Sequence, residues 1–314
     1  MSLPLSDARL NPAQLAARSA GIAAGLAAGA LWGLVFIAPR VVENYGGVEL
    51  TAGRFAIYGA VAAFLMLATL RRHPLPTLRQ AGAAAALSVL GFTGYYLLLA
   101  FSIRDAGSEV PTLIIGTIPL AVMLLGKPHG LRWRTLVPAI ALTVAGLFLM
   151  MRSSGGFGSA ESGPHFARGL LLAAAAMASW TVFAIGNAAW LKKNPDVDVT
   201  AWTNWLGVGA GAGGALLWLA AGPDAAEAAV RPDRWLFLAV CVATGFGSAW
   251  LATVLWNIAS VRLPASLCGQ LIVSETLFGL LYSFMWDQHL PSATQLVACV
   301  LFMLGIVVSI RAHR

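Results

Sequence analysis

The chain consists almost entirely of long apolar runs that are separated by short polar or charged joins. Each run is continuously apolar, whereas a membrane β-strand alternates apolar and polar residues over roughly ten positions, so the pattern predicts helices. A bilayer core about 30 Å thick requires roughly 20 apolar residues per spanning helix. Runs of this kind lie near residues 19–38, 48–70, 80–101, 108–126, 133–151, 168–190, 199–220, 234–257, 264–285 and 292–310. The predicted fold class is therefore an all-α membrane protein with ten transmembrane helices.

The ten runs form two sets of five, and the second set echoes the first. Matching positions recur at a nearly constant offset: Trp32 with Trp180, Thr51-Ala52 with Thr200-Ala201, Gly91-Phe92 with Gly245-Phe246, and Gly146 with Gly305. Such a consistent offset indicates an internal repeat. Because five is odd, the second set must enter the membrane from the opposite side, which predicts two inverted five-helix repeats.

Composition supports a membrane protein. No join between the apolar runs is long enough to form a soluble catalytic domain. Apolar residues make up 59% of the chain and charged residues 11%, compared with roughly half and a quarter in soluble domains. The 3 cysteines, Cys241, Cys268 and Cys299, fall within predicted spans and lack metal-ligand spacing. We therefore expect neither a metal ion nor another cofactor.

The distribution of charge predicts the orientation of the chain. The net charge is +7, and most basic residues fall on the side of both termini, namely Arg9, Arg18, Arg71, Arg72, Arg79, Lys127, Arg132, Arg134, Lys192, Lys193, Arg262, Arg311 and Arg314. The opposite side carries Arg40, Arg104, Arg152, Arg168, Arg231 and Arg234. By the positive-inside rule, both termini are expected to be cytoplasmic, in the cell inner membrane. The basic charge then reflects topology and contact with anionic lipid of the bilayer rather than a nucleic-acid partner.

These assignments divide the chain into four parts. We expect a cytoplasmic N-terminal segment at 1–18, the first five-helix repeat at 19–152, an external linker at 153–167 and the second five-helix repeat at 168–311.

Several short motifs occur in order along these runs: Ala30-Leu31-Trp32-Gly33, Arg54-Phe55, Pro119, Glu275, and the glycines Gly146 and Gly305. In these motifs the chain resembles the drug/metabolite transporter superfamily, specifically its ten-helix exporters with two duplicated five-helix units. The Gly94-Tyr95-Tyr96 segment and Trp180 resemble the amino acid exporter branch, including YddG-type aromatic amino acid exporters. The resemblance implies an exporter that works by alternating access, and we expect it to act as a monomer.

Glu275 is the sharpest candidate for chemistry because it is a carboxylate well inside a predicted span. An ionised carboxylate in hydrocarbon is costly unless it is paired, so it is expected either to contact a substrate ammonium group or to couple proton movement. The structural alternative is a protonated carboxyl group that bonds a neighbouring helix. Arg54 is expected to snorkel toward the external interface; if it faces a cavity instead, it can bind a substrate carboxylate bidentately.

Most tryptophans lie near span ends, where bilayers favour an interfacial belt. These are Trp133, Trp190, Trp202, Trp205, Trp218, Trp235, Trp256 and Trp286. Trp32, Trp180 and Trp250 lie deeper, where they either stack on a ring or cation in a cavity or fill gaps between helices. Tyr95 and Tyr96 are adjacent, and adjacent helical residues point about 100° apart, so at most one is expected to face the cavity fully.

Further hydrogen-bonding side chains lie in the sixth, eighth and ninth runs, at Asn187, Ser248, Asn257, Gln270 and Ser274. Gln270 and Ser274 are one helical turn apart and Glu275 adjoins Ser274, so the three can share one broad face. Hydrogen bonding between helices explains each residue individually. As a cluster they favour a solvated cavity.

Gly21, Gly25, Gly29 and Gly33 repeat every four residues and form a smooth ridge on the first run. The ridge is expected to admit a close helix contact, either as static packing or as a gate surface. Pro119 should kink the fourth run, whereas Pro111 lies in its first turn and is tolerated there.

The leading hypothesis is export of small-molecule amino acids, aromatic and other neutral ones, through a central apolar cavity lined by the first, third, fourth, sixth, eighth and ninth runs. The same aromatic cavity would accept drugs, nucleosides or other metabolites. An intramembrane enzyme is disfavoured because all five histidines lie in joins or at the terminus. A channel is disfavoured because no repeated filter is visible, and the absence of a Walker A motif argues against direct use of ATP.

Overall fold

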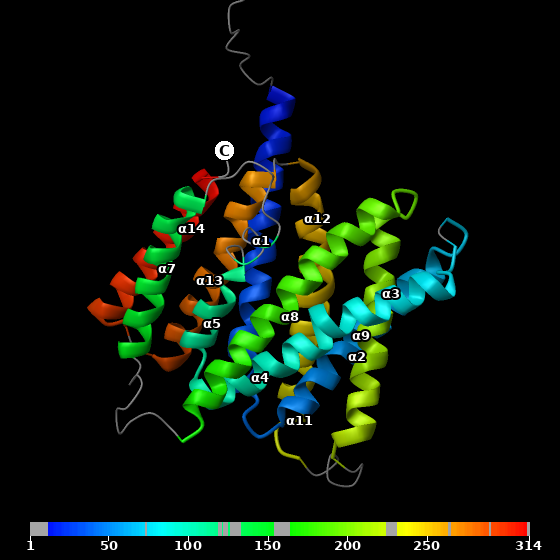
Figure 1. Ribbon diagram of the computed structural model, residues 1–314. Helices are drawn as coiled ribbons and strands as arrows, with labels where there is room; N and C mark the ends of the chain where they lie inside the picture. The colour runs from blue at the N-terminus through cyan, green and yellow to red at the C-terminus, as the bar shows by residue number, and fades with distance from the viewer. Residues whose placement is uncertain are drawn as a thin grey trace, which may run out of the picture.

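The structure, a computed structural model, describes residues 12–72, 74–118, 121, 125, 133–153, 164–223, 231–262, 265–288 and 290–312. Within these ranges every element of regular secondary structure is a helix (Figure 1). The predicted all-α fold class is confirmed.

The helices follow the predicted runs closely. The first half of the chain contains α1 (Pro12–Val41), α2 (Gly47–Ala68), α3 (Leu78–Ser88), η1 (Val89–Thr93), α4 (Gly94–Ala106), α5 (Glu109–Ile115) and α7 (Trp133–Ser153). The second half contains α8 (Phe166–Lys193), α9 (Val199–Ala221), α11 (Arg234–Val242), η2 (Ala243–Leu251), α12 (Ala252–Arg262), α13 (Ala265–Asp287) and α14 (Ala293–Ala312). The segments η1 and η2 are π-helical, and each continues directly into the α-helices on both sides of it.

Five helical segments in the described residues are long and apolar enough to cross a membrane: Ala16–Val41, Gly47–Ala68, Leu78–Ala106, Phe166–Leu191 and Arg234–Trp256. Shorter apolar helices occupy Val137–Met150 and Ala293–Gly305. The fourth predicted run is described without a break only as far as residue 118, and Pro119 lies outside the described residues. The count of ten spanning helices therefore stays a prediction.

The first helix begins at Pro12, within the segment that was expected to precede the first span. Proline is favoured at the first helical position because its missing N–H needs no partner there. Ala13, Ala16 and Ala17 follow, and alanine has the strongest intrinsic preference for helix. Local propensity thus carries the helix beyond the apolar run.

Polar side chains mark where several other helices begin. The backbone N–H of Thr77 donates to Gln80 Oε1 (2.9 Å) and that of Gln80 donates to Thr77 Oγ1 (3.3 Å), which is a capping box at the start of α3. The backbone N–H of Ala201 donates to Asp198 Oδ1 (2.9 Å) at the start of α9. Such caps satisfy N–H groups that have no partner within the helix.

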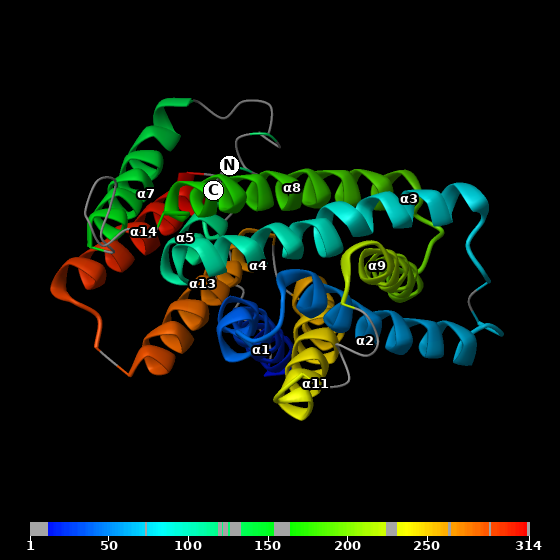
Figure 2. The ribbon, with the colours of Figure 1, turned by 90° about the horizontal axis from the view of Figure 1, so that it is seen from below.

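Helices from the two halves of the chain pack against each other rather than forming separate bundles (Figures 1 and 2). The main neighbours are α2 with α9, α7 with α14, α1 with α12 and α13, and α4 with α8. Each of these pairs joins an element of the first half to one of the second. Any cavity in the middle is therefore shared between the halves.

Glycines set the separation of two of these pairs. A Cβ atom added at Gly59 would lie 2.7 Å from Gly211 Cα, and one added at Gly211 would lie 2.8 Å from Gly59 Cα. Between α7 and α14, a Cβ at Gly146 would lie 2.8 Å from the carbonyl oxygen of Ala298. Helices that approach this closely have no room for a larger residue.

The glycine ridge on α1 is buried along its length, and Gly25, Gly29 and Gly33 face α13. A Cβ at Gly29 would lie 3.1 Å from the backbone nitrogen of Glu275 and in direct clash with Ser274 Oγ. The ridge therefore fixes the distance between α1 and the helix that carries Glu275. Pro111 is buried in the first turn of α5, where proline is tolerated.

A polar cluster joins the ends of α1, α5 and α13 at the opposite end of the bundle from the start of α1. Arg40 forms an ion pair with Asp287 and donates to Ser108 Oγ (3.0 Å) and Ser283 Oγ (3.3 Å). Ser108 and Ser283 are also hydrogen-bonded to each other. We call Arg40, Ser108, Ser283 and Asp287 the end cluster.

We expect Gly29→Ala to lower the melting temperature of the purified protein in detergent, because overpacking typically costs about 1–3 kcal/mol. The matched control is Gly82→Ala in α3, where an added Cβ meets nothing within 4 Å. That control should be neutral or stabilising by up to about 1 kcal/mol, since alanine favours helix more than glycine does. Equal melting temperatures for the two variants would mean that α1 and α13 separate freely.

Candidate functional site

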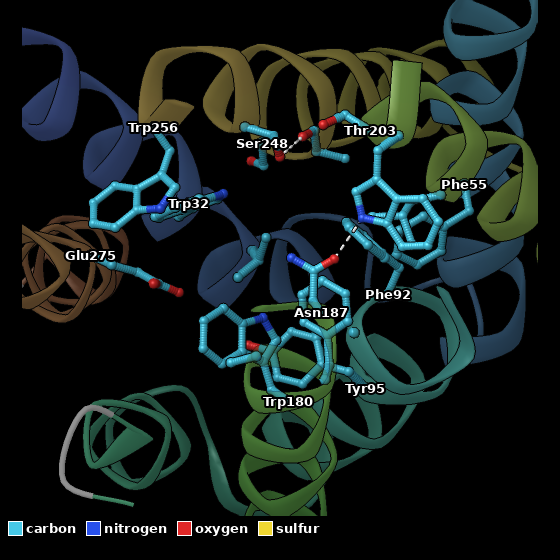
Figure 3. Close-up of a pocket in the computed structure, with 18 of the residues that line it drawn as sticks. Trp32, Phe55, Phe92, Tyr95, Trp180, Asn187, Thr203, Ser248, Trp256 and Glu275 are labelled. Atoms are coloured by element: carbon cyan, nitrogen blue, oxygen red, sulfur yellow. Dashed lines mark hydrogen bonds between the residues drawn. The ribbon is translucent and has the colours of Figure 1, made fainter. Parts of the chain in front are cut away.

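A cavity of about 290 Å³ lies between the two halves of the chain. Small-molecule sites span roughly 300–1,000 Å³, so its size is at the lower end for a metabolite. Aromatic side chains dominate its wall (Figure 3): Trp32, Phe55, Phe92, Tyr95, Trp180, Phe183, Trp202 and Trp256. Its polar lining consists of Arg54, Asn187, Thr203, Ser248, Thr253 and Glu275.

Six of the predicted cavity residues line this one space: Trp32, Tyr95, Trp180, Asn187, Ser248 and Glu275. They come from α1, α4, α8, η2 and α13, which are far apart in the sequence. The helices α2 and α9 also contribute to the wall, although neither belonged to the predicted lining. The described part of the fourth run contributes no lining residue.

Of the remaining predicted cavity residues, the described Tyr96 and Trp250 do not line the space. Tyr96 is fully buried, beneath the guanidinium group of Arg54, whereas Tyr95 faces the cavity. Trp250 stacks on Phe246 with ring centroids 5.4 Å apart. Pro119 and the side chain of Gln270 lie outside the described residues.

The side chain of Arg54 is buried at the cavity, with 5% of the residue exposed, and does not snorkel to an interface as the sequence suggested. Its guanidinium carbon lies 4.1 Å from the ring centroid of Tyr96 and 5.1 Å from that of Phe55. Its Nε and NH1 atoms are buried without a hydrogen-bond partner in the described residues. A buried charge is costly unless it is paired, and the two rings offset only part of that cost.

Glu275 supplies the negative group of the cavity. Its carboxyl group points into the space from α13 (Figure 3). The positive charge of Arg54 acts on it electrostatically, but the two side chains form no ion pair in the described residues. The cavity therefore presents an acidic and a basic side chain that are not neutralised by direct contact with each other.

Two tryptophans that the sequence assigned to the interfacial belt belong to the cavity wall instead. Trp202 is 1% exposed and stacks on Trp190 with ring centroids 3.6 Å apart. Its indole N–H donates to Asn187 Oδ1 at 2.7 Å. Trp256 packs against Trp32 with ring centroids 5.4 Å apart. The positions of Trp202 and Trp256 near the ends of predicted spans suggested the interfacial belt. The rotation of each helix about its axis instead turns these rings toward the cavity.

The sequence did not single out three phenylalanines of the cavity wall, Phe55, Phe92 and Phe183. A phenylalanine in an apolar run carries no signal that distinguishes it from its neighbours. Phe92 lies in η1 next to Gly91, where an added Cβ would clash with the ring of Phe183 at 2.4 Å. The Gly91-Phe92 pair therefore brings the π-helical segment against α8. π-helical segments are frequent at functional sites.

The serine and threonine hydroxyl groups of the wall are already committed as donors. Thr203 donates to the carbonyl oxygen of Val199 (2.8 Å) and Thr253 to that of Ala249 (2.6 Å), in each case four residues earlier in the chain. Ser248 donates to the carbonyl oxygen of Leu31 and so links η2 to α1. The arrangement suits reversible binding of an amphipathic small molecule.

The described residues include no group of three or more His, Cys, Asp or Glu side chains that could hold a metal ion.

Comparisons with known proteins agree with a transport role. The sequence profile of the EamA-like transporter family matches residues 19–152. Inner membrane protein YtfF of Escherichia coli strain K12 is 31% identical over 307 residues, which cover 93% of this chain and 95% of that protein. Aromatic amino acid exporter YddG of Ancylobacter novellus is 27% identical over 299 residues, which cover 93% of this chain and 97% of that protein. A solved crystal structure superimposes with a TM-score of 0.67 at 25% identity, covering 93% of this chain and 98% of that chain.

We expect Arg54→Met to raise the melting temperature of the purified protein, because it removes a buried charge whose Nε and NH1 atoms have no partner among the residues that the structure describes. The matched control is Arg72→Met on the exposed turn after α2, which should change stability by less than about 0.5 kcal/mol. A clear loss of stability in Arg54→Met alone would mean that contact with the rings of Phe55 and Tyr96 is the main role of Arg54.

Proposed function

Because the chain belongs to the EamA-like transporter family of the drug/metabolite transporter superfamily, we propose that it exports neutral and aromatic amino acids by alternating access. The observation that carries this proposal is the combination of aromatic walls with Arg54 and Glu275 in one cavity. An aromatic amino acid has a matching ring, carboxylate and ammonium group. The relative that is named an aromatic amino acid exporter supports the same substrate class.

Reciprocal contacts between the halves support the inverted repeat on which alternating access depends. The sequence pairs Gly146 with Gly305; a Cβ at Gly146 would meet the carbonyl oxygen of Ala298 in α14, and one at Gly305 would meet that of Ala139 in α7, at 2.9 Å. Gly59 and Gly211 approach each other in the same reciprocal way. Contacts of this kind are expected when a two-fold axis relates two halves.

The order of helix contacts supports the same relation. The first helix of the first half, α1, packs on α12 and α13, and the first helix of the second half, α8, packs on α4 and α5. These pairs exchange under the predicted repeat. In Figure 1, α1 runs downward whereas α8 runs upward, as an inverted relation requires.

The cavity wall and the end cluster lie toward different ends of the bundle. The wall includes Leu191 and Val199, which flank the join between α8 and α9 at the end where α1 begins. The end cluster ties α1, α5 and α13 together at the other end. With both termini on the cytoplasmic side of the inner membrane, this arrangement corresponds to a state that loads from the cytoplasm and is closed externally.

We expect purified protein in liposomes to catalyse counterflow, so that vesicles loaded with unlabelled phenylalanine transiently accumulate labelled phenylalanine. Counterflow requires a carrier that reorients with its substrate and is not produced by an open pore. Protein-free liposomes and unloaded proteoliposomes are the controls. If no amino acid is transported while a drug or nucleoside is transported robustly, the proposed substrate class is wrong.

We expect Glu275→Gln to abolish any stimulation of transport by a pH gradient, because a glutamine side chain cannot exchange a proton. The measurement compares labelled phenylalanine uptake into proteoliposomes with and without the gradient. Glu43→Gln, which changes an exposed carboxylate between α1 and α2, is the control and should leave the stimulation intact. Stimulation that persists in Glu275→Gln would assign Glu275 to structure or substrate contact alone.

A further inference from the structure

Asn187 contributes an amide group to the cavity wall from α8. Its Oδ1 atom accepts the hydrogen bond from the indole N–H of Trp202 at 2.7 Å. An indole N–H can only donate, so the amide oxygen must face Trp202 and the amide nitrogen must face away from it. In Figure 3 that nitrogen points into the cavity, toward the side on which Trp32, Trp180 and Glu275 lie.

Trp202 is held rigidly enough to fix this orientation. Its ring is stacked on Trp190 with an interplanar angle of 10° and meets Trp205 edge-on at 6.0 Å. Only 1% of the residue is exposed. Rotation of the Asn187 amide would place its NH₂ group against the indole N–H and leave both donors unpaired. Unpaired buried donors are costly, so the amide stays in one orientation.

The fixed amide nitrogen is an obligate donor that no described residue of the protein uses. In the described residues, Asn187 Nδ2 has no hydrogen-bond acceptor, whereas the hydroxyl groups of Thr203, Ser248 and Thr253 all donate to backbone carbonyl oxygens. A ligand acceptor can therefore bind at Asn187 without displacing a protein contact. The matching group is an anionic or carbonyl oxygen.

Charge decides between these two acceptors. Arg54 lines the same cavity and makes it favourable for a negative group, while Glu275 offers a separate contact for a positive group. We propose that Asn187 is a specificity-determining residue that recognises the carboxylate of a zwitterionic substrate, with Trp202 as the positioning residue that aims its amide. This inference rests on the proposed function and deepens it.

Asn187→Asp tests the donor directly. An aspartate has nearly the same shape and still accepts the indole N–H of Trp202, but it lacks the NH₂ group. In competition for labelled phenylalanine counterflow, we expect tryptophan to lose roughly 10-fold or more in apparent affinity, as for a lost hydrogen bond to a charged group. Tryptamine, which has the same ring and ammonium group but no carboxylate, should compete as well as before or better. Asn44→Asp, in the exposed loop between α1 and α2, is the matched control.

Trp202→Phe tests the positioning role and does not depend on whether Asn187→Asp folds. The phenyl ring keeps the stack on Trp190 but removes the N–H that orients the amide. We expect the KM for phenylalanine to rise several-fold with little change in maximal rate, and competition by tryptamine to stay unchanged. Trp235→Phe removes the same atoms from an exposed tryptophan of α11 and should leave the KM unchanged.

Equal losses for tryptophan and tryptamine in either variant would overturn the proposal, because they would indicate a general change in cavity shape. Unchanged competition by tryptophan in Asn187→Asp would also overturn it. Equilibrium binding of labelled phenylalanine to the purified protein separates this inference from the proposed function. Absence of transport in the wild type contradicts the export function, whereas wild-type binding that is insensitive to Asn187→Asp contradicts only the role of Asn187.

Discussion

The close approach of helices from opposite halves of the chain is the constraint on which the rest of this structure depends. Gly59 in α2 and Gly211 in α9 lie so close that a Cβ atom added to either would lie within 2.8 Å of the Cα atom of the other. The glycine ridge brings α1 equally close to α13. In hydrocarbon, apolar burial supplies little drive for helices to associate, so packing of this kind and polar contacts must hold them together. Aromatic residues at other positions of α1, α2 and α9 line the cavity.

The polar groups of the cavity are arranged by the same packing. Asn187 is oriented by Trp202, Trp202 is held between Trp190 and Trp205, and Ser248 is tied to α1. In the described parts of the chain, Arg54 lacks a comparable partner for its Nε and NH1 atoms. Stability alone would favour an apolar residue at that position, since removing a buried charge often costs nothing or stabilises. A charge kept under these conditions is best explained by an anionic group that arrives with the substrate.

The sequence predicts helices well here because the hydrophobic requirement of a bilayer is simple and long runs satisfy it clearly. It predicts the rotation of those helices poorly, and the errors follow from that. Trp202 lies at the depth of an interfacial belt but faces inward, and Arg54 lies within reach of an interface but is buried. The orientation of both side chains depends on which faces of α2 and α9 pack together. That packing is set by Gly59 and Gly211 rather than by Arg54 or Trp202. Charges and tryptophans near span ends are therefore weak evidence for lipid exposure when a glycine contact is close by in the sequence.

The two halves contribute to the cavity with different degrees of symmetry. Trp32 and Trp180, which the predicted repeat pairs, both line the wall, so the proposed aromatic substrate would meet similar rings on both sides. The predicted repeat places Asn187 opposite Pro39, near the end of α1, and proline has no amide side chain. A donor that occurs in only one half would hold the carboxylate against that half throughout a transport cycle. Rings that the repeat relates suit the movement of the two halves. Polar groups that occur in one half alone suit recognition of the substrate in a single orientation. Repeat symmetry and substrate specificity can therefore coexist in one small cavity.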